Sequence, residues 1–336
     1  MKTRKLGRSL EVSAIGMGCM GFTHAYGEAP EEQECIRLVH FAFEKGCTLF
    51  DTAEMYSYFK NEEFVGKALK ELPRDKVVIS DKFWPLPLPG QENEFPEGKL
   101  SEKGIRHDIE GSLRRLQTDY IDLYIEHQMD DGSEEAVAEV MGKLIKEGKI
   151  RAWGQSSSTV EQIRKAHAVT PISAIQSEYS MMERKWEADV LPLCRELGIG
   201  YMAFAPMGNG FLSGKYSASS EFSGNDLRRV ITRFNKENME KNAPLLEMIG
   251  RFAAEKGCTN AQIALAWVLR YGDFVVPIPG MRREGRVLEN LGAADITLTD
   301  SEYAAINAAL DDIRIYGSRD GKDIKKLGTV PENVVR

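Results

Sequence analysis

Three consecutive stretches of the sequence decide the fold: YIDLYIEH (120–127), SEEAVAEVMGKLIKEGKI (133–150) and IRAWGQSS (150–157). The first and third are short runs of apolar and β-branched residues, about the length of a strand buried on both faces. The middle stretch places five apolar residues on one face of a helix: Val137, Val140, Met141, Leu144 and Ile145. A strand, a helix and a strand in this order predict a parallel sheet.

The same pattern recurs along the whole chain. Six further runs have the character of buried strands, namely AIGMG (14–18), CTLFDT (47–52), KVVISDK (76–82), ISAIQSEY (172–179), IGYMAFAP (199–206) and DFVVPIPG (273–280). Eight strands separated by amphipathic stretches over roughly 300 residues favour a (β/α)8 TIM barrel over a doubly wound sheet. No shift in composition marks a boundary, so residues 1–336 are expected to form a single domain.

Several segments lie outside this repeat. Residues 3–13 are expected to form an N-terminal β-hairpin that turns at Gly7–Arg8 and closes the barrel floor. The long connections 84–104 and 209–238 follow the third and seventh strands, so they are expected over the C-terminal face, where such folds keep their chemistry. The polar tail 316–336 is either a flap or a frayed end. Two helix starts have capping-box spacing, Ser158–Glu161 and Thr299–Glu302.

The composition excludes several classes of protein. The 336 residues carry a formal charge of −7, which argues against a general nucleic-acid binder. The five cysteines form no CxxC pair, which indicates a reducing compartment and no metal cage. The start lacks the apolar core of a signal peptide, and no apolar run approaches the length of a membrane span. A cytoplasmic protein acting on a small molecule is the expectation, and the oligomeric state stays open, a homo-oligomer included.

Four polar residues stand at consecutive strand ends. Asp51 ends the second predicted strand, Tyr56 lies in the loop after it, Lys82 ends the third strand and His127 the fourth. Because neighbouring strands lie about 4.8 Å apart, these groups are expected to converge at the barrel mouth. Asp51 would hold Lys82, whose ammonium would lower the pKa of Tyr56, and Tyr56 would act as a general acid with His127 as a second donor. Taken singly, each residue is more often a turn, surface or packing residue; the four together favour function.

The chain resembles the aldo-keto reductases over nearly its whole length. The matching stretches include FDTAEMY (50–56), NEEFVGKAL (61–69), APMGNGFLSGK (205–215) and LENLGA (288–293), in order and at family spacing. With GCMG (18–21) near its start, the sequence is most similar to the bacterial and plant pyridoxal reductase- and perakine reductase-like subgroup. The resemblance implies a barrel enzyme that transfers hydride from NADPH to a carbonyl without a metal, with Asp51, Tyr56, Lys82 and His127 as its catalytic tetrad.

The resemblance also implies a cofactor site. No GxGxxG opens a helix after the first strand, which disfavours a Rossmann site. Arg282, Arg283 and Arg286 stand beside a helix N-terminus and form either a solvated basic turn or a phosphate site. The family pattern assigns them to the 2′-phosphate of NADP, together with Glu289 and Asn290 for the adenine. It assigns the remaining cofactor contacts to Met20, Gly21, Asp51, Ser156, Ser157, Gln176, Phe204, Ala205, Met207, Gly208, Gly210, Lys215 and Gly280.

The substrate pocket is the least determined part of the prediction. Phe22, Tyr58, Trp84 and Met129 are candidates for an aromatic wall, although each is individually more typical of ordinary packing. Relatives usually follow the tyrosine of the tetrad with glycine, whereas this chain has Ser57 and Tyr58. Two alternatives to a carbonyl reductase stay open at this level: a lyase forming a Schiff base at Lys82, and a partner subunit that binds NADPH without turning it over.

Overall fold

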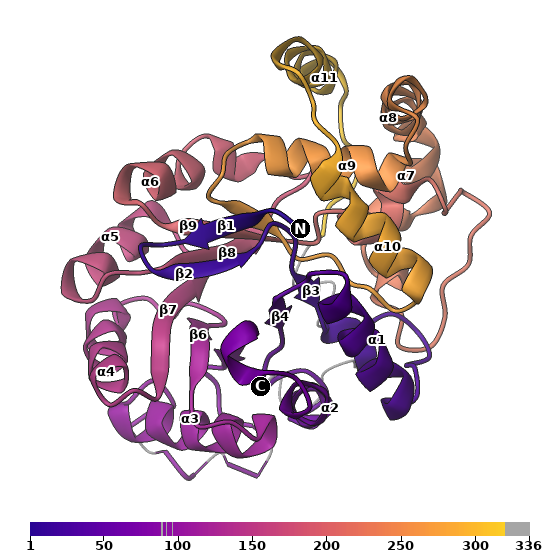
Figure 1. The fold of residues 1–336 in the computed structure, drawn as a ribbon. Coiled ribbons are helices and arrows are strands. Elements are labelled where there is room, and N and C mark those ends of the chain that lie inside the picture. Colours follow the sequence, from indigo (N-terminus) through magenta and orange to yellow (C-terminus); the bar gives the residue numbers. More distant parts are fainter. Residues whose placement is uncertain (89, 92, 96, 320–336) are drawn as a thin grey trace.

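The computed structural model describes residues 1–88, 90–91, 93–95 and 97–319, and in these residues one sheet of eight strands forms the centre of the molecule (Figure 1). Every strand pair in this sheet is parallel, and the order β10-β9-β8-β7-β6-β5-β4-β3 follows the chain. Its two edges meet, because Gly16 N–H donates to the Pro277 carbonyl at 3.0 Å and Gly18 N–H to the Pro279 carbonyl at 3.1 Å. The predicted (β/α)8 barrel with its N-terminal hairpin is confirmed.

All eight predicted strands occur where the sequence placed them. The barrel strands are β3 (Met17–Gly18), β4 (Leu49–Asp51), β5 (Val78–Phe83), β6 (Ile121–Glu126), β7 (Ile150–Ser156), β8 (Ala174–Glu178), β9 (Gly200–Phe204) and β10 (Val275–Pro277). The helices are α1 (Glu32–Glu44), α2 (Lys60–Lys70), α3 (Glu102–Leu116), α4 (Glu134–Lys146), α5 (Val160–Val169), α6 (Val190–Leu197), α7 (Lys236–Lys241), α8 (Ala243–Lys256), α9 (Asn260–Arg270), α10 (Glu284–Gly292) and α11 (Asp300–Asp312). Short 3₁₀ turns lie at Met20–Phe22, Arg74–Lys76, Lys185–Glu187, Gly208–Ser213, Leu227–Arg229, Thr232–Phe234 and Ala293–Asp295.

The hairpin of β1 (Thr3–Leu6) and β2 (Leu10–Ser13) crosses one end of the barrel (Figure 1). Its turn uses Gly7 with φ 63°, where an added Cβ would lie 2.8 Å from the Ser173 backbone. Arg4 fastens the hairpin from outside the barrel, because its guanidinium donates to the carbonyls of Leu269, Gly272 and Val275 at 2.5–2.8 Å. The hairpin therefore closes the end of the barrel opposite the strand tips, as predicted.

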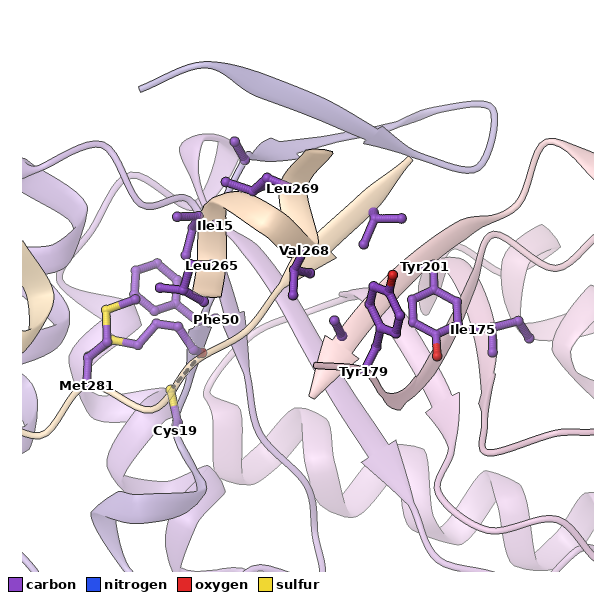
Figure 2. Close-up of a cluster of buried hydrophobic side chains, with 14 of the residues drawn as sticks. Ile15, Cys19, Phe50, Ile175, Tyr179, Tyr201, Leu265, Val268, Leu269 and Met281 are labelled. Carbon is purple, nitrogen blue, oxygen red and sulfur yellow. Dashed lines mark hydrogen bonds between the residues drawn. The ribbon is translucent and has the colours of Figure 1, made fainter. Parts of the chain in front are cut away.

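The core consists of two clusters, because side chains of a strand alternate between the two faces of a sheet. One cluster fills the barrel interior and includes Leu49, Leu123 and Met202. The larger cluster lies between the sheet and the helices. Figure 2 shows part of it, where Leu265, Val268 and Leu269 of α9 pack near residues of the sheet such as Phe50.

Some details differ from the sequence prediction. The predicted capping box Ser158–Glu161 at the start of α5 is wrong by one residue: the helix begins at Val160, and Thr159 and Gln162 form the box. The predicted box Thr299–Glu302 is confirmed at α11. Of the predicted connection 84–104 and tail 316–336, positions 89, 92, 96 and 320–336 lie outside the described residues. Among the described helices, none is long and apolar enough to cross a membrane.

Candidate active site

The four polar residues predicted at strand ends come together at the carboxyl end of the barrel. Asp51 is the last residue of β4, and Lys82 is near the end of β5 with its side chain turned into the barrel beside that of Ser80. His127 directly follows β6, and its backbone N–H donates to the Phe83 carbonyl at 2.9 Å. The alternation along β5 explains how a lysine reaches the interior, because residues 80 and 82 share one face of the strand.

Lys82 is the centre of this arrangement. Its Nζ lies 2.7 Å from Asp51 Oδ2, 2.7 Å from the Thr52 carbonyl and 3.3 Å from the Tyr56 hydroxyl. All three donor positions of the ammonium are therefore used, and the side chain is only 1% exposed. We call Asp51, Tyr56, Lys82 and His127 the quartet.

Asp51 is held by two further donors that sequence reasoning did not assign to it. Ser80 Oγ donates to Asp51 Oδ1 at 2.8 Å, and Gln176 Nε2 donates to the same oxygen at 2.8 Å. Ser80 precedes Lys82 by two residues, so the strand period alone could have identified it. These bonds fix the carboxylate, and the carboxylate in turn fixes the ammonium of Lys82.

The turn that follows Tyr56 has an unusual backbone conformation. The three residues after it, Ser57, Tyr58 and Phe59, have φ values of 51°, 48° and 73°, in the left-handed region that non-glycine residues rarely adopt. Ser57 Oγ donates to the Thr23 carbonyl at 2.7 Å, which ties the turn to the neighbouring loop. The Tyr56 ring packs edge-on against His127 with centroids 5.8 Å apart.

Burial and charge set the protonation states of the quartet. Burial opposes the charge of Lys82, but Asp51 and the bond to Tyr56 outweigh it and raise the lysine pKa overall. Burial and the charge of Lys82 lower the pKa of His127 well below its usual value, so the imidazole is neutral at physiological pH. Burial raises the pKa of Tyr56, and Lys82 opposes this only in part. The sequence prediction of a lowered tyrosine pKa was therefore wrong in its net direction, because burial exceeds the effect of the ammonium.

The quartet faces a cavity of about 940 Å³ that extends from the strand tips to α10. Asp51, Tyr56 and His127 line one end of it, while Lys82 lies behind Asp51 and Tyr56 and is not part of the lining. The predicted cofactor residues that line the same cavity are Met20, Gly21, Ser156, Gln176, Phe204, Ala205, Met207, Gly210, Lys215, Gly280, Arg282, Arg283, Arg286 and Asn290.

Three predicted cofactor residues lie elsewhere. Ser157 is exposed with φ 59°, and its backbone N–H donates to the Gln176 carbonyl at 3.0 Å. Gly208 is buried, and a Cβ added there would meet the Met182 sulfur at 2.9 Å. Glu289 forms an ion pair with Arg286 and lines a separate, smaller cavity at the side of α10.

The three predicted arginines differ in their contacts. Arg282 donates to the backbone carbonyls of Tyr26 and Glu28, so its guanidinium fastens the loop after β3. Arg283 is the residue before α10 and Arg286 lies in the first turn of that helix; both line the large cavity. Two guanidinium groups at a helix N-terminus are a favourable site for a phosphate group.

The four residues predicted to line the substrate pocket lie in different surroundings. Phe22 is 1% exposed and belongs to the core between sheet and helices. Trp84 packs edge-on against His127 with ring centroids 5.0 Å apart. Tyr58 and Met129 are half-buried, and none of the four residues lines the large cavity.

Several residues that line the cavity had no signal in the sequence. Asn209 Nδ2 donates to the Tyr26 hydroxyl at 2.8 Å, and the Arg228 guanidinium lies 5.4 Å from the Tyr26 ring, so the loops after β3 and β9 meet across the cavity. The Arg319 guanidinium lies 5.0 Å from the Phe204 ring, which brings the end of the described chain to the same cavity. Each of these pairs joins segments that are far apart in the sequence, so no short sequence motif could have predicted it. In the described part of the chain, no group of three or more His, Cys, Asp or Glu side chains is placed to hold a metal ion.

The molecule is a closed parallel barrel with acid–base residues at its strand tips and cations lining the same cavity. These features are typical of barrel enzymes, whose chemistry occurs at the carboxyl face. Within that class, the chain belongs to the aldo/keto reductase family, because the family's model matches residues 14–311. A probable aldo-keto reductase 1 of Glycine max is 40% identical over 98% of this chain and 96% of its own length.

Solved structures agree with this family. A glycerol dehydrogenase from Gluconobacter oxydans superimposes with a TM-score of 0.83 at 30% identity, covering 95% of this chain and 98% of that one. An aldo/keto reductase from Klebsiella pneumoniae in complex with NADP and acetate gives a TM-score of 0.72 at 30% identity, covering 91% and 94% of the two chains.

Proposed function

We propose that this protein reduces aldehyde or ketone carbonyls to alcohols with NADPH as the hydride donor. The observation that carries the proposal is the contact of Lys82 Nζ with both Asp51 and the Tyr56 hydroxyl at the end of the large cavity. The membership of the aldo/keto reductase family and the NADP bound to the Klebsiella pneumoniae protein support the choice of reaction and cofactor.

In this proposal, Tyr56 donates the proton. Its raised pKa keeps the phenol protonated across the physiological range, and its hydroxyl borders the cavity. As the carbonyl oxygen becomes an alkoxide it takes the phenolic proton, and the Lys82 ammonium stabilises the phenolate that is left. His127, which is neutral because its pKa is lowered, donates an N–H to the same oxygen. A bound NADPH would supply the hydride.

The residues at the other end of the cavity fit the cofactor. Arg283 and Arg286 at the N-terminus of α10 carry the positive charge that a 2′-phosphate requires. NADPH is therefore expected to bind more tightly than NADH, which carries a hydroxyl at that position. Ser156, Gln176 and Phe204 border the cavity near the quartet, where they would hold the nicotinamide.

The protonation state of Lys82 opposes the alternative lyase mechanism. Schiff-base formation needs a neutral amine, whereas the pKa of Lys82 is raised and all three of its donor positions are occupied. The alternative of a cofactor-binding protein without turnover makes a different prediction, namely NADPH binding without NADPH consumption.

The test is the consumption of NADPH and of NADH in the presence of an activated aromatic aldehyde. The proposal predicts faster consumption of NADPH and its loss in the Tyr56→Phe variant. NADPH binding, seen as quenching of tryptophan fluorescence, with no consumption for a panel of aldehydes and ketones would contradict the proposed activity.

A further inference from the structure

A second group of charged side chains lies buried behind the quartet, on the outer face of the barrel wall. Lys99, from the connection between β5 and α3, has its Nζ 3.0 Å from Glu54 Oε1 and 3.3 Å from Asp108 Oδ1. All three side chains are at most 2% exposed, and none lines the large cavity. The proposed acid–base chemistry does not use this group, so its presence needs another explanation.

A buried ion pair is a weak source of stability. Removing a lysine and a glutamate from water costs several kcal/mol per ion, and the attraction between them only roughly balances that cost. Burial and the charge of Glu54 raise the pKa of Asp108 to about 9, so Asp108 holds a proton at neutral pH. The Glu54 carboxylate then lies between two cations, Lys99 at 3.0 Å and the Arg115 guanidinium at 4.0 Å. The question is what the closer pair, Lys99 with Glu54, holds in place.

Glu54 connects the end of β5 to the segment that carries Tyr56. Its backbone N–H donates to the Lys82 carbonyl at 3.1 Å, and its Oε1 accepts from the Trp84 backbone N–H at 2.7 Å. Glu54 precedes Tyr56 by two residues, and Trp84 packs against His127. Glu54 therefore joins the segment that carries Tyr56 to the end of β5 twice, once through its backbone N–H and once through its carboxylate.

The segment after Tyr56 is strained and needs such anchoring. Three consecutive non-glycine residues, Ser57 to Phe59, are left-handed, which costs on the order of 1 kcal/mol each and persists only where surrounding contacts fix the backbone. On its far side, the Arg115 guanidinium lies 4.0 Å from the Phe59 ring and 2.6 Å from Glu62. The turn is thus held at one end by Glu54 and at the other by Arg115.

We propose that Lys99 is a positioning residue for Tyr56: through its buried ion pair with Glu54, it fixes the segment 53–59 and thereby the place of the phenol relative to Lys82 and His127. This inference rests on the proposed function. Lys99 touches none of the quartet, so its effect on turnover passes through Glu54. A displacement of about 1 Å in a proton donor such as Tyr56 can lower turnover about 100-fold.

The experiment compares Lys99→Met, which keeps the length of the side chain and removes its charge, with Lys99→Arg, which keeps the charge. The matched control is Arg74→Met at the opposite end of the barrel, where Arg74 pairs with the buried Asp122 at 2.7 Å. Each variant is assayed for NADPH affinity by fluorescence quenching, for kcat and KM with an activated aromatic aldehyde, and for the solvent deuterium isotope effect on kcat. Rates are taken per molecule that binds cofactor, so partial unfolding does not lower them.

Lys99→Met is expected to lower kcat about tenfold or more while the Kd for NADPH changes by less than about twofold, since only the proton donor is displaced. The solvent isotope effect should rise, because proton donation becomes slower relative to the other steps. Lys99→Arg should recover most of the loss. Arg74→Met should lower the thermal stability and leave both kcat and the isotope effect unchanged.

Unchanged kcat and isotope effect in Lys99→Met would overturn the inference and leave Lys99 with a structural role only. If Lys99→Met fails to fold, the double variant Glu54→Gln with Lys99→Met removes both charges and retains an oxygen that can accept from Trp84. A wild-type kcat in that variant would also overturn it. If the wild-type protein consumes no NADPH, the proposed function is contradicted. If the wild type is active, Tyr56→Phe is inactive and the Lys99 variants are unaffected, only the inference about Lys99 is contradicted.

Discussion

The two ends of the large cavity are built differently. At the strand tips, Asp51 and Lys82 are buried, and apart from the bond of Lys82 to Tyr56, the bonds that hold them come from a strand or from the first residue after one. At the rim, Arg283 and Arg286 lie at the start of α10 with much of their side chains exposed, and Arg286 already has Glu289 as a partner. Strands hold the groups proposed to do chemistry, and partly exposed arginine side chains form the proposed cofactor site. We therefore expect severe losses from changes at the strand tips and graded losses from changes at the rim.

The largest effect is expected for Lys82→Met. This change leaves Asp51 buried without its counter-charge, which destabilises a fold by about 3–5 kcal/mol, and it removes the stabilisation of the Tyr56 phenolate. Denaturant unfolding and turnover should both show the loss. The matched control is Lys67→Met, which breaks an exposed pair with Glu32 and should cost at most about 1 kcal/mol. Similar unfolding free energies for the two variants would contradict this account of the strand tips.

The next effect is expected for Tyr56→Phe. Loss of the phenolic proton should lower kcat about 10²- to 10⁴-fold, the usual contribution of a general acid. The Kd for NADPH should stay nearly constant, because the ring and its contact with His127 are retained. The control Tyr120→Phe removes a hydroxyl at the other end of the barrel and should leave turnover unchanged. Substantial turnover in Tyr56→Phe would remove the tyrosine from the mechanism.

A smaller and more selective effect is expected at the rim. Arg283→Ala and Arg286→Ala should each raise the KM for NADPH about tenfold, in line with the loss of one charge-assisted hydrogen bond. The KM for NADH and the kcat should change little, so the preference for NADPH falls. The Glu289→Gln variant removes the ion pair of Arg286, so the guanidinium becomes free to bind the 2′-phosphate. It should therefore lower the KM for NADPH slightly. An equal rise in KM for both cofactors would contradict a 2′-phosphate site.

The smallest effect is expected in the pH dependence of stability. The pKa of His127 is lowered in the folded protein, so between that value and the ordinary value of about 6.5 only the unfolded state binds the proton. Stability from this residue is complete above pH 6.5 and is lost as the pH falls below it, by at most about 1.4 kcal/mol per pH unit. The difference in unfolding free energy between wild type and His127→Gln should therefore decrease from pH 7 to pH 5. A constant difference would mean that His127 titrates normally in the fold.

The sequence predicted the strand tips better than the rim for a physical reason. Strand periodicity places Asp51, Lys82 and His127 on the inner face of consecutive strands, and parallel strands bring their ends to one side. The same rule could have found Ser80. By contrast, the contacts of Arg282 with the Tyr26 and Glu28 carbonyls, and of Asn209 with Tyr26, join loops whose geometry has no period.

Burial was the second quantity that the sequence did not predict. Phe22 has the same aromatic character as a pocket residue but lies in the core, and the pKa of Tyr56 rises because burial exceeds the influence of Lys82. The pair of Lys99 with Glu54 joins positions 45 residues apart and had no motif to reveal it. The cytoplasmic location, the single-domain organisation and the oligomeric state remain predictions.

The central claim is that the strand tips donate the proton while the rim binds the cofactor. The most direct test measures NADPH consumption and NADPH binding side by side in wild type, Tyr56→Phe and the Arg283→Ala, Arg286→Ala double variant, with one aromatic aldehyde. The account predicts that Tyr56→Phe binds NADPH normally but does not consume it, and that the arginine variant binds weakly but reaches the wild-type rate at saturating NADPH. A Tyr56→Phe protein that binds poorly, or an arginine variant that stays slow at saturation, would contradict it.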